Sequence, residues 1–187
     1  MKKVFKFIGF TFLALFVLGF FIGEKENNNP VPTNTGVEEP IRTSKKESTY
    51  VTIGEILKTD KFEVTVNNVA LENEVKTGNP YSSLKQEEGV FYLILDIKFK
   101  NIDKESRTIF NGNVIVVSNS TGEALTYDRP EHVFAKGWGL FFDSINPGIS
   151  KKTKLVYKLP NDLSDVSLYY VPYSAPSNTF IALGTIS

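Results

Sequence analysis

The stretch from Thr126 to Gly148 concentrates the side chains whose types could do chemistry in this chain. It contains the single histidine, the single tryptophan and four further aromatic residues: His132, Trp138, Tyr127, Phe134, Phe141 and Phe142. Aromatic rings bury a large area at a small entropy cost, so this stretch is a candidate site for gripping a peptide, a sugar or a lipid surface. The alternative interpretation is structural, with the same rings capping the open end of a β-sandwich.

Polar residues of the same stretch suggest two weaker candidates. Asp128, Glu131, His132 and Asp143 offer oxygen and nitrogen ligands, but calcium needs about six or more oxygen ligands and the spacing matches no known cation loop. A triad of Ser144, His132 and Asp128 would lack both a nucleophile elbow and a signature for an oxyanion hole. We therefore expect no enzyme activity, no catalytic residue, no metal site and no cofactor.

The composition narrows the possible partners. The chain has 187 residues and no cysteine, which excludes disulfides, thiolate metal sites and cysteine nucleophiles. Its 21 Lys and Arg residues balance 21 Asp and Glu residues. Because residues 1–23 hold three lysines and no acid, the rest of the chain is mildly acidic. Without a basic stripe we expect no nucleic-acid partner.

The first structural element that the sequence predicts is an apolar segment within residues 1–23. Three lysines precede an uncharged run of 17 residues, Phe7 to Gly23. A helix of this length covers roughly 25 Å, close to the ~30 Å hydrocarbon core of a bilayer. Since basic residues stay on the cytoplasmic side, we predict a single-pass anchor formed by residues 4–23, with the N-terminus in the cytoplasm and the rest of the chain outside.

A cleaved signal peptide, followed by secretion, is the alternative for this segment. Cleavage after Gly23 would place Phe21 at the −3 position, where a small residue is needed. A lipid anchor is excluded because the chain has no cysteine to acylate. We therefore favour the uncleaved anchor.

Residues 24–48 are predicted to form a disordered linker. Asn, Pro, Thr, Glu and Lys dominate, and Pro30, Pro32 and Pro40 prevent a helix. A segment with so few apolar residues cannot offset its ordering entropy.

Residues 49–187 show the period of two that is typical of β-strands. In the clearest strand, within 89–103, Phe91 to Phe99 place odd-numbered apolar residues on one face and mostly polar residues on the other, so one face should be buried and the other mostly wet. The alternation in the strand 62–71 shifts after Asn67, which predicts a bulge. Further runs predict strands at 113–119, 123–127, 150–159, 166–173 and 179–186.

Turn residues separate these strands. Asn119 to Gly122 predicts a hairpin loop, and Asn146-Pro147-Gly148 precedes the strand 150–159. Seven or more short strands with frequent turns predict an all-β fold, an immunoglobulin-like antiparallel β-sandwich, with a barrel as the main alternative.

The order of several structural motifs resembles a known family. These motifs are Ile53-Gly54-Glu55, the strand Phe62–Val66 with Val69, the strand Phe91–Asn101 ending in Lys-Asn, and an Asn-Pro-Gly turn before a strand ending Lys158-Leu159-Pro160. They resemble the immunoglobulin-like domains of unknown function in exported proteins and lipoproteins, chiefly of Gram-positive bacteria, which are similar in fold to a small secreted mycobacterial antigen. The resemblance covers about residues 50–186. It implies a fold and an envelope location and brings no catalytic residues, and the chain departs from it in lacking the lipobox cysteine and in its aromatic insertion around Glu131–Ser144.

We therefore expect a non-enzymatic, membrane-tethered module outside the cytoplasmic membrane. Its expected partners are that membrane, through residues 4–23, and an envelope protein or a cell-wall component. The alternative function is a carrier or sensor that holds a small apolar molecule or a lipid between its sheets.

Overall fold

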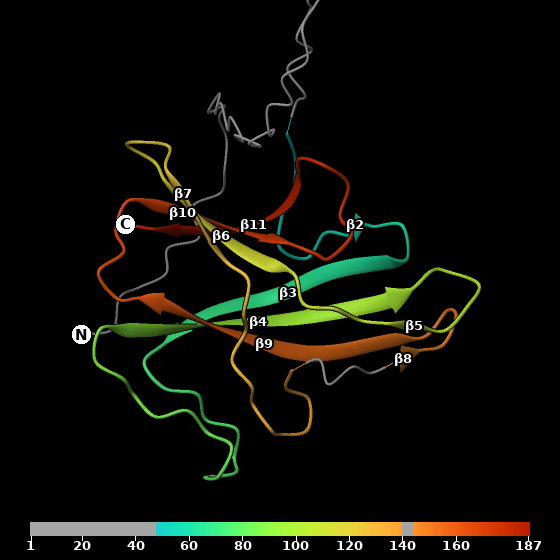
Figure 1. Ribbon diagram of the computed structural model, residues 1–187, viewed down its shortest axis with the longest axis horizontal. Coiled ribbons are helices and arrows are strands. Elements are labelled where there is room, and N and C mark those ends of the chain that lie inside the picture. Colours follow the sequence, from blue (N-terminus) through green and yellow to red (C-terminus); the bar gives the residue numbers. More distant parts are fainter. Residues whose placement is uncertain (1–47, 140–143) are drawn as a thin grey trace, which may run out of the picture.

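A computed structural model describes residues 48–139 and 144–187 (Figure 1). These residues form eleven β-strands. The strands are β1 (Thr49–Val51), β2 (Leu57–Lys58), β3 (Phe62–Glu72), β4 (Val90–Asn101), β5 (Arg107–Thr108), β6 (Asn113–Ser118), β7 (Ala124–Tyr127), β8 (Ser144–Ile145), β9 (Ser150–Pro160), β10 (Val166–Val171) and β11 (Thr179–Ile186). The predicted anchor and all but the last residue of the predicted linker lie outside the described residues. Within the described ranges, no helix has the length and apolar character needed to cross a bilayer.

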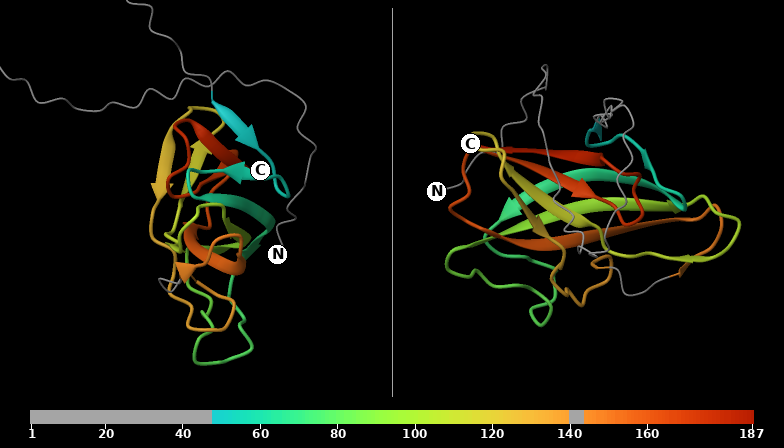
Figure 2. Two further views of the ribbon diagram at one scale, coloured as in Figure 1. Left: turned by 90° about the vertical axis from the view of Figure 1, so that its right-hand side faces the viewer. Right: turned by 45° about the horizontal axis from the view of Figure 1, so that its top comes forward.

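Two sheets lie face to face, so the fold is a sandwich rather than a barrel (Figures 1 and 2). The five-stranded sheet has the order β1-β11-β10-β6-β7, and the four-stranded sheet has the order β2-β3-β4-β9. A small two-stranded sheet, β5-β8, lies at one end. The pairing is not wholly antiparallel as predicted, because β1 pairs in parallel with β11. The three residues of β1 lack any pattern that could have predicted this.

The seven long strands confirm the predicted runs. The shift predicted after Asn67 is present as an irregularity in the pairing of β3 with β4 between Val66 and Asn68. The hairpin predicted at 119–122 joins the antiparallel strands β6 and β7. The short strands β2, β5 and β8 were not predicted, since two residues cannot show a period.

The main hydrophobic core fills the space between the two sheets. Its members include inward-facing residues of β4 (Leu93, Leu95 and Ile97) and of β10 (Leu168 and Tyr170), all with no solvent exposure. The carrier alternative needs room between the sheets for an apolar molecule. Because side chains of this core occupy the space, the structure gives that alternative no support.

A second cluster lies on the opposite side of the four-stranded sheet. It consists of Val75, Tyr92, Val133, Trp138 and Val156. The even-numbered face of β4 was predicted to be mostly wet, yet Tyr92 is fully buried there. Residues from the segments 73–89 and 128–139 cover this part of the sheet, a long-range contact that the alternation within one strand cannot reveal.

Two motifs behind the family resemblance have local structural roles. In Ile53-Gly54-Glu55, Gly54 has a φ of 89°, which favours glycine, and the Glu55 carboxylate accepts a hydrogen bond from the Thr52 amide at 2.6 Å. Asn101, at the end of β4, is fully buried, and its side-chain amide donates to the carbonyl oxygen atoms of Glu105 and Ile145. Both motifs therefore shape the turns that end the strands.

Candidate functional site

Trp138 is buried and lies over the outer face of the four-stranded sheet. Its side chain has 9% of its surface exposed and packs with Val75, Tyr92, Val133 and Val156. This position differs from both sequence interpretations, because the ring neither projects into solvent nor caps the open end between the sheets. It covers the sheet from outside.

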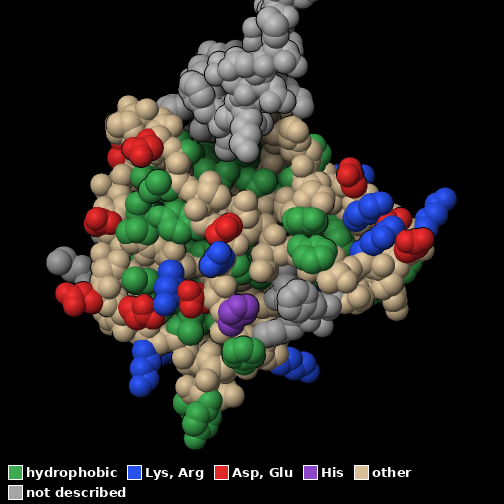
Figure 3. Space-filling view, viewed as in Figure 1, with side chains coloured by type: hydrophobic (Ala, Val, Ile, Leu, Met, Phe, Trp, Pro, Cys, Tyr) green, Lys and Arg blue, Asp and Glu red, His purple; other side chains and the backbone are tan. Residues whose placement is uncertain are grey.

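The other aromatic candidates are dispersed. Tyr127 is half-buried and packs against the main core, where burial raises the pKa of its hydroxyl. The rings of His132 and Phe134 stack with their centroids 6.3 Å apart, and both side chains are exposed, with the histidine visible at the surface in Figure 3. Phe141 and Phe142 lie outside the described residues. The described candidates therefore do not converge on one site.

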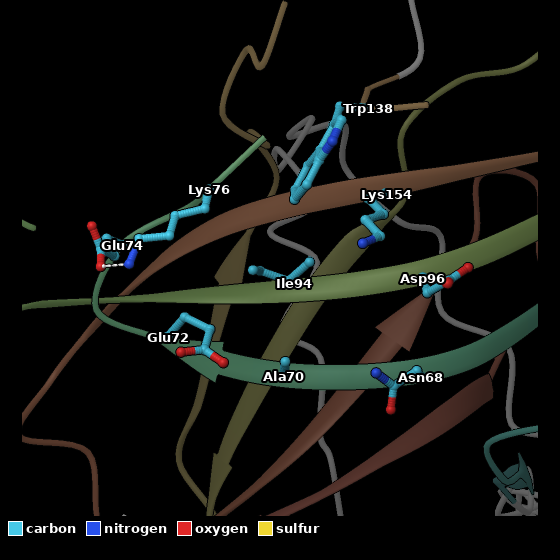
Figure 4. Close-up of a pocket in the computed structure, with 9 residues that line it drawn as sticks. All are labelled: Asn68, Ala70, Glu72, Glu74, Lys76, Ile94, Asp96, Trp138 and Lys154. Atoms are coloured by element: carbon cyan, nitrogen blue, oxygen red, sulfur yellow. Dashed lines mark ion pairs between the residues drawn. The ribbon is translucent and has the colours of Figure 1, made fainter. Parts of the chain in front are cut away.

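A groove on the outer face of the four-stranded sheet brings polar side chains together beside Trp138 (Figure 4). It has a volume of about 370 Å³. Its lining comes from three neighbouring strands and the two covering segments: Asn68, Ala70, Glu72, Glu74, Lys76, Ile94, Asp96, Trp138 and Lys154. Of these residues, only Trp138 was predicted from the sequence as a site residue. The charged even-numbered face of β4 was the available signal for the rest.

The register of the sheet places the groove residues in rows. Asn68 on β3 is opposite Asp96 on β4, and Asp96 is opposite Lys154 on β9. The ammonium group of Lys154 lies 4.9 Å from the centroid of the Trp138 ring, in cation–π contact. At the other side of the groove, Lys76 and Glu74 form an ion pair of 2.6 Å. The groove therefore presents positive and negative charges, an amide and an aromatic ring, most of them from three hydrogen-bonded strands.

The segment around Trp138 is fixed along the free edge of β9. The Gly139 amide donates to the Lys154 carbonyl at 2.8 Å, and the Lys154 amide donates to the Gly137 carbonyl at 2.9 Å. The Thr153 hydroxyl adds a hydrogen bond of 2.7 Å to the Gly139 carbonyl. These bonds cover an edge that would otherwise invite another strand, and they hold the indole in place.

An ionic network joins the two covering segments to the sheet. The Tyr92 hydroxyl donates to the Glu87 carboxylate at 3.0 Å, and Lys158 contacts Glu87 at 2.9 Å and Glu131 at 3.7 Å. Burial is the main cause that raises the pKa of Tyr92, while the Lys158 hydrogen bond lowers the pKa of Glu87. Glu87 and Glu131 belong to different covering segments, so Lys158 links both of them to β9.

The tip of the segment 73–89 presents one tyrosine. Tyr81 has 98% of its side chain exposed, and its amide donates to the Asn79 side chain at 3.0 Å. Ser82 and Ser83 also bond the Asn79 carbonyl, and Val75 bridges to Leu84 at the base. The loop is therefore internally ordered despite its length.

The groove and the two covering segments lie on the side of the sandwich opposite to the start of the described chain. β1 is an edge strand of the five-stranded sheet, whereas the loops 73–89 and 128–139 project beyond the four-stranded sheet (Figures 1 and 2). Anything that approaches from the side of Thr49 therefore meets the five-stranded sheet first.

The predicted polar candidates lie partly within the described residues. In the ranges 48–139 and 144–187, no three His, Asp or Glu side chains gather in a way that could hold a metal ion. Asp143, a member of the proposed cation cluster, lies outside those ranges. The groove offers hydrogen-bonding groups, charges and an aromatic ring, which are groups that can bind a ligand.

Comparison with known proteins yields a family and a fold. The profile of a family described as "Domain of unknown function (DUF4352)" matches residues 51–178. An uncharacterized β-sandwich protein from Clostridium difficile is 21% identical with a TM-score of 0.54, covering 80% of this chain and 99% of that one. A conserved hypothetical protein from Bacillus anthracis is 19% identical with a TM-score of 0.49, over 71% and 94%. No curated protein matches the chain.

Proposed function

Because the chain belongs to the DUF4352 family, whose description states no activity, we propose its function from geometry: a non-enzymatic, immunoglobulin-like binding module of the cell envelope. Its ligand is a polar cell-wall component, held in the groove of the four-stranded sheet. The family profile matches residues 51–178, which belong to the sandwich domain, and the matched region does not include residues 1–23.

The groove is the observation that carries this proposal. Asp96 and Lys154 offer opposite charges on adjacent strands, and Trp138 adds an aromatic wall. A ligand with sugar hydroxyls, amines and carboxylates, such as a cell-wall glycopeptide, complements these groups through hydrogen bonds, ion pairs and ring contacts. An apolar molecule would leave the same charges desolvated without partners.

The tether is the second part of the proposal. Residues 4–23 anchor the chain in the cytoplasmic membrane, and residues 24–48 carry the domain outside it. The apolar run from Phe7 to Gly23 and its lysine flank support this orientation. Secretion after cleavage is the alternative. Sequencing the N-terminus of the mature protein separates them, since Met1 or Lys2 in the membrane fraction supports the anchor and a new N-terminus near Glu24 in the medium contradicts it.

Co-sedimentation with isolated, insoluble cell walls tests the binding proposal. The full chain is kept in detergent micelles, and its bound fraction is measured with wild type, Lys154→Glu and Lys98→Glu. Reversing a charge next to a ligand charge should weaken binding by about tenfold. Lys98 lies on the same face of the sheet but outside the groove, so its variant should bind like the wild type. Equal sedimentation of both variants, with unchanged thermal unfolding, would contradict the groove as the site.

A further inference from the structure

The five-stranded sheet differs sharply from its partner in charge. Its strands β1, β6, β7, β10 and β11 contain no charged residue on either face. The four-stranded sheet carries Lys98, Lys100 and Asp96 on β4 alone, and β9 adds further lysines. One outer face of the sandwich is therefore uncharged and the other is strongly charged.

Alternation identifies which residues form the uncharged outer face. Leu168 and Tyr170 of β10 point into the core, so Tyr169 points outward, and Ile181 of β11 likewise places Phe180 outward. Together with Tyr50 of β1 and Thr126 of β7, they define what we call the aromatic face. Ile115 of β6 lies between Tyr169 and Thr126 in the register but is only 8% exposed.

Three rings form a continuous group at the β1 edge of this face. The ring of Tyr50 lies 5.7 Å from that of Phe180 and 5.6 Å from that of Tyr169, and the last two are 6.1 Å apart. Tyr50 keeps 47% of its surface exposed. Tyrosine rings that present both an apolar body and a hydroxyl to solvent are typical of surfaces that lie at a membrane–water interface.

The point at which the chain enters the sandwich favours a lipid surface as the partner of the aromatic face. The described chain begins at Ser48, two residues before Tyr50, and the aromatic face lies on this side of the sandwich (Figures 1 and 2). A chain segment as long as the linker predicted for residues 24–48 has a mean reach of roughly 25–30 Å when it behaves as a random coil. If residues 4–23 are anchored, the aromatic face is thus held at high local concentration beside the bilayer.

We propose that the aromatic face docks on the surface of the bilayer that holds residues 4–23. Tyr50, Tyr169 and Phe180 enter the interfacial region, where no charge of these strands needs to be desolvated. Docking turns the groove of the four-stranded sheet away from the membrane and toward the cell wall. This inference rests on the anchor in the proposed function.

Site-specific labels test the docking on the full chain. Since the chain has no cysteine, a single cysteine can carry a fluorophore at Thr126→Cys on the aromatic face or at Lys98→Cys on the opposite face. The labelled chains are reconstituted in phosphatidylcholine vesicles that contain a nitroxide lipid. We expect several-fold stronger quenching at position 126 than at position 98. Equal quenching overturns the proposal.

A matched pair of substitutions tests the role of the rings. Tyr50→Asp should lower the docking equilibrium constant by about tenfold, because half-burial of one ring is worth roughly that factor. Tyr81→Asp makes the same change on the far side of the sandwich and should leave the quenching at position 126 unchanged. Fluorescence of the single tryptophan checks the fold. Ala182 is opposite Tyr169 in the sheet and shares the aromatic face, so Ala182→Glu replaces Tyr50→Asp if the latter variant unfolds. Equal effects of the two aspartate variants overturn the proposal.

Two further outcomes distinguish a failure of the membrane anchor from a failure of docking. A chain that does not float with the vesicles contradicts the anchor in the proposed function. A chain that floats but shows no excess quenching at position 126 contradicts only the docking. Self-quenching between labels that rises with protein density would show a second copy on the aromatic face and would also overturn it.

Discussion

Tyr157 and Tyr170, on facing sheets, bind the same backbone residue from two directions. The Tyr157 hydroxyl donates to the Gly112 carbonyl oxygen at 2.7 Å, and the Gly112 amide donates to the Tyr170 hydroxyl at 3.2 Å. Both side chains have no exposed surface, and burial raises the pKa of each hydroxyl. The connection between β5 and β6 is thereby joined to both sheets inside the core.

Tyr170→Phe should destabilise the domain by about 1–3 kcal/mol, because the buried Gly112 amide loses its hydrogen-bond partner. Urea unfolding followed by circular dichroism measures the change. Tyr173→Phe is the matched control, since Tyr173 is 58% exposed. A similar loss in both variants would show that the bond to Gly112 contributes little.

Gly112→Ala should be more damaging than most glycine substitutions. A Cβ atom at position 112 would lie 2.2 Å from the Val171 carbonyl oxygen and 2.7 Å from the Tyr170 ring, so the backbone must move. We expect a loss of about 2 kcal/mol or more in unfolding free energy, typical of overpacking. Wild-type stability of this variant in urea would contradict the close approach.

Asn101 should be one of the most sensitive polar positions. Its amide donates to Glu105 and Ile145 at 2.8 and 2.7 Å, and its side-chain oxygen accepts from the Asp103 amide at 2.9 Å. Asn101→Ala removes all three bonds and should cost about 3 kcal/mol. Asn67→Ala, at an exposed position, should change the unfolding free energy by less than about 0.5 kcal/mol. Comparable losses would contradict the role of Asn101.

These sites illustrate what the sequence could predict. Alternation placed the strand 90–101 correctly, because one buried face imposes a strict period on residues such as Leu93, Leu95 and Ile97. The Lys-Asn ending of that strand was noted as a motif. The Asn101 side chain bonds Glu105, four residues away, and Ile145 of β8, 44 residues away. The second bond depends on a long-range contact and was not predictable.

The candidate site was less predictable than the fold. Trp138 was singled out by type, but its burial also depends on Val75 of the other covering segment and on Tyr92 and Val156 of the sheet. The groove combines Asn68, Asp96 and Lys154 only through the register of three strands. Sequence spacing carries no information on such register when the strands are joined by long loops.

Asp103 gives the stability a dependence on acid pH. The Arg107 side chain, the Lys104 amide and Lys61 lower its pKa to about 2, from an ordinary value near 3.8. A carboxylate with a lowered folded-state pKa stabilises the fold above its unfolded pKa, and this contribution is lost as the pH falls from about 4 toward 2. Thermal unfolding across this range should show a smaller decline for Asp103→Asn than for the wild type. Parallel declines would contradict the assignment.

Trp138→Ala should destabilise the outer face of the four-stranded sheet before it affects the main core. The indole packs with Val75, Tyr92, Val133 and Val156, and removing a buried tryptophan typically costs about 3–5 kcal/mol. Because the second cluster lies outside the main core, we expect local opening, in which Gly139 and Lys154 lose amide protection while Leu168 keeps it. Hydrogen exchange measures both. Trp138→Phe should retain most of the protection, and simultaneous loss at Leu168 would show that the two clusters unfold as one unit.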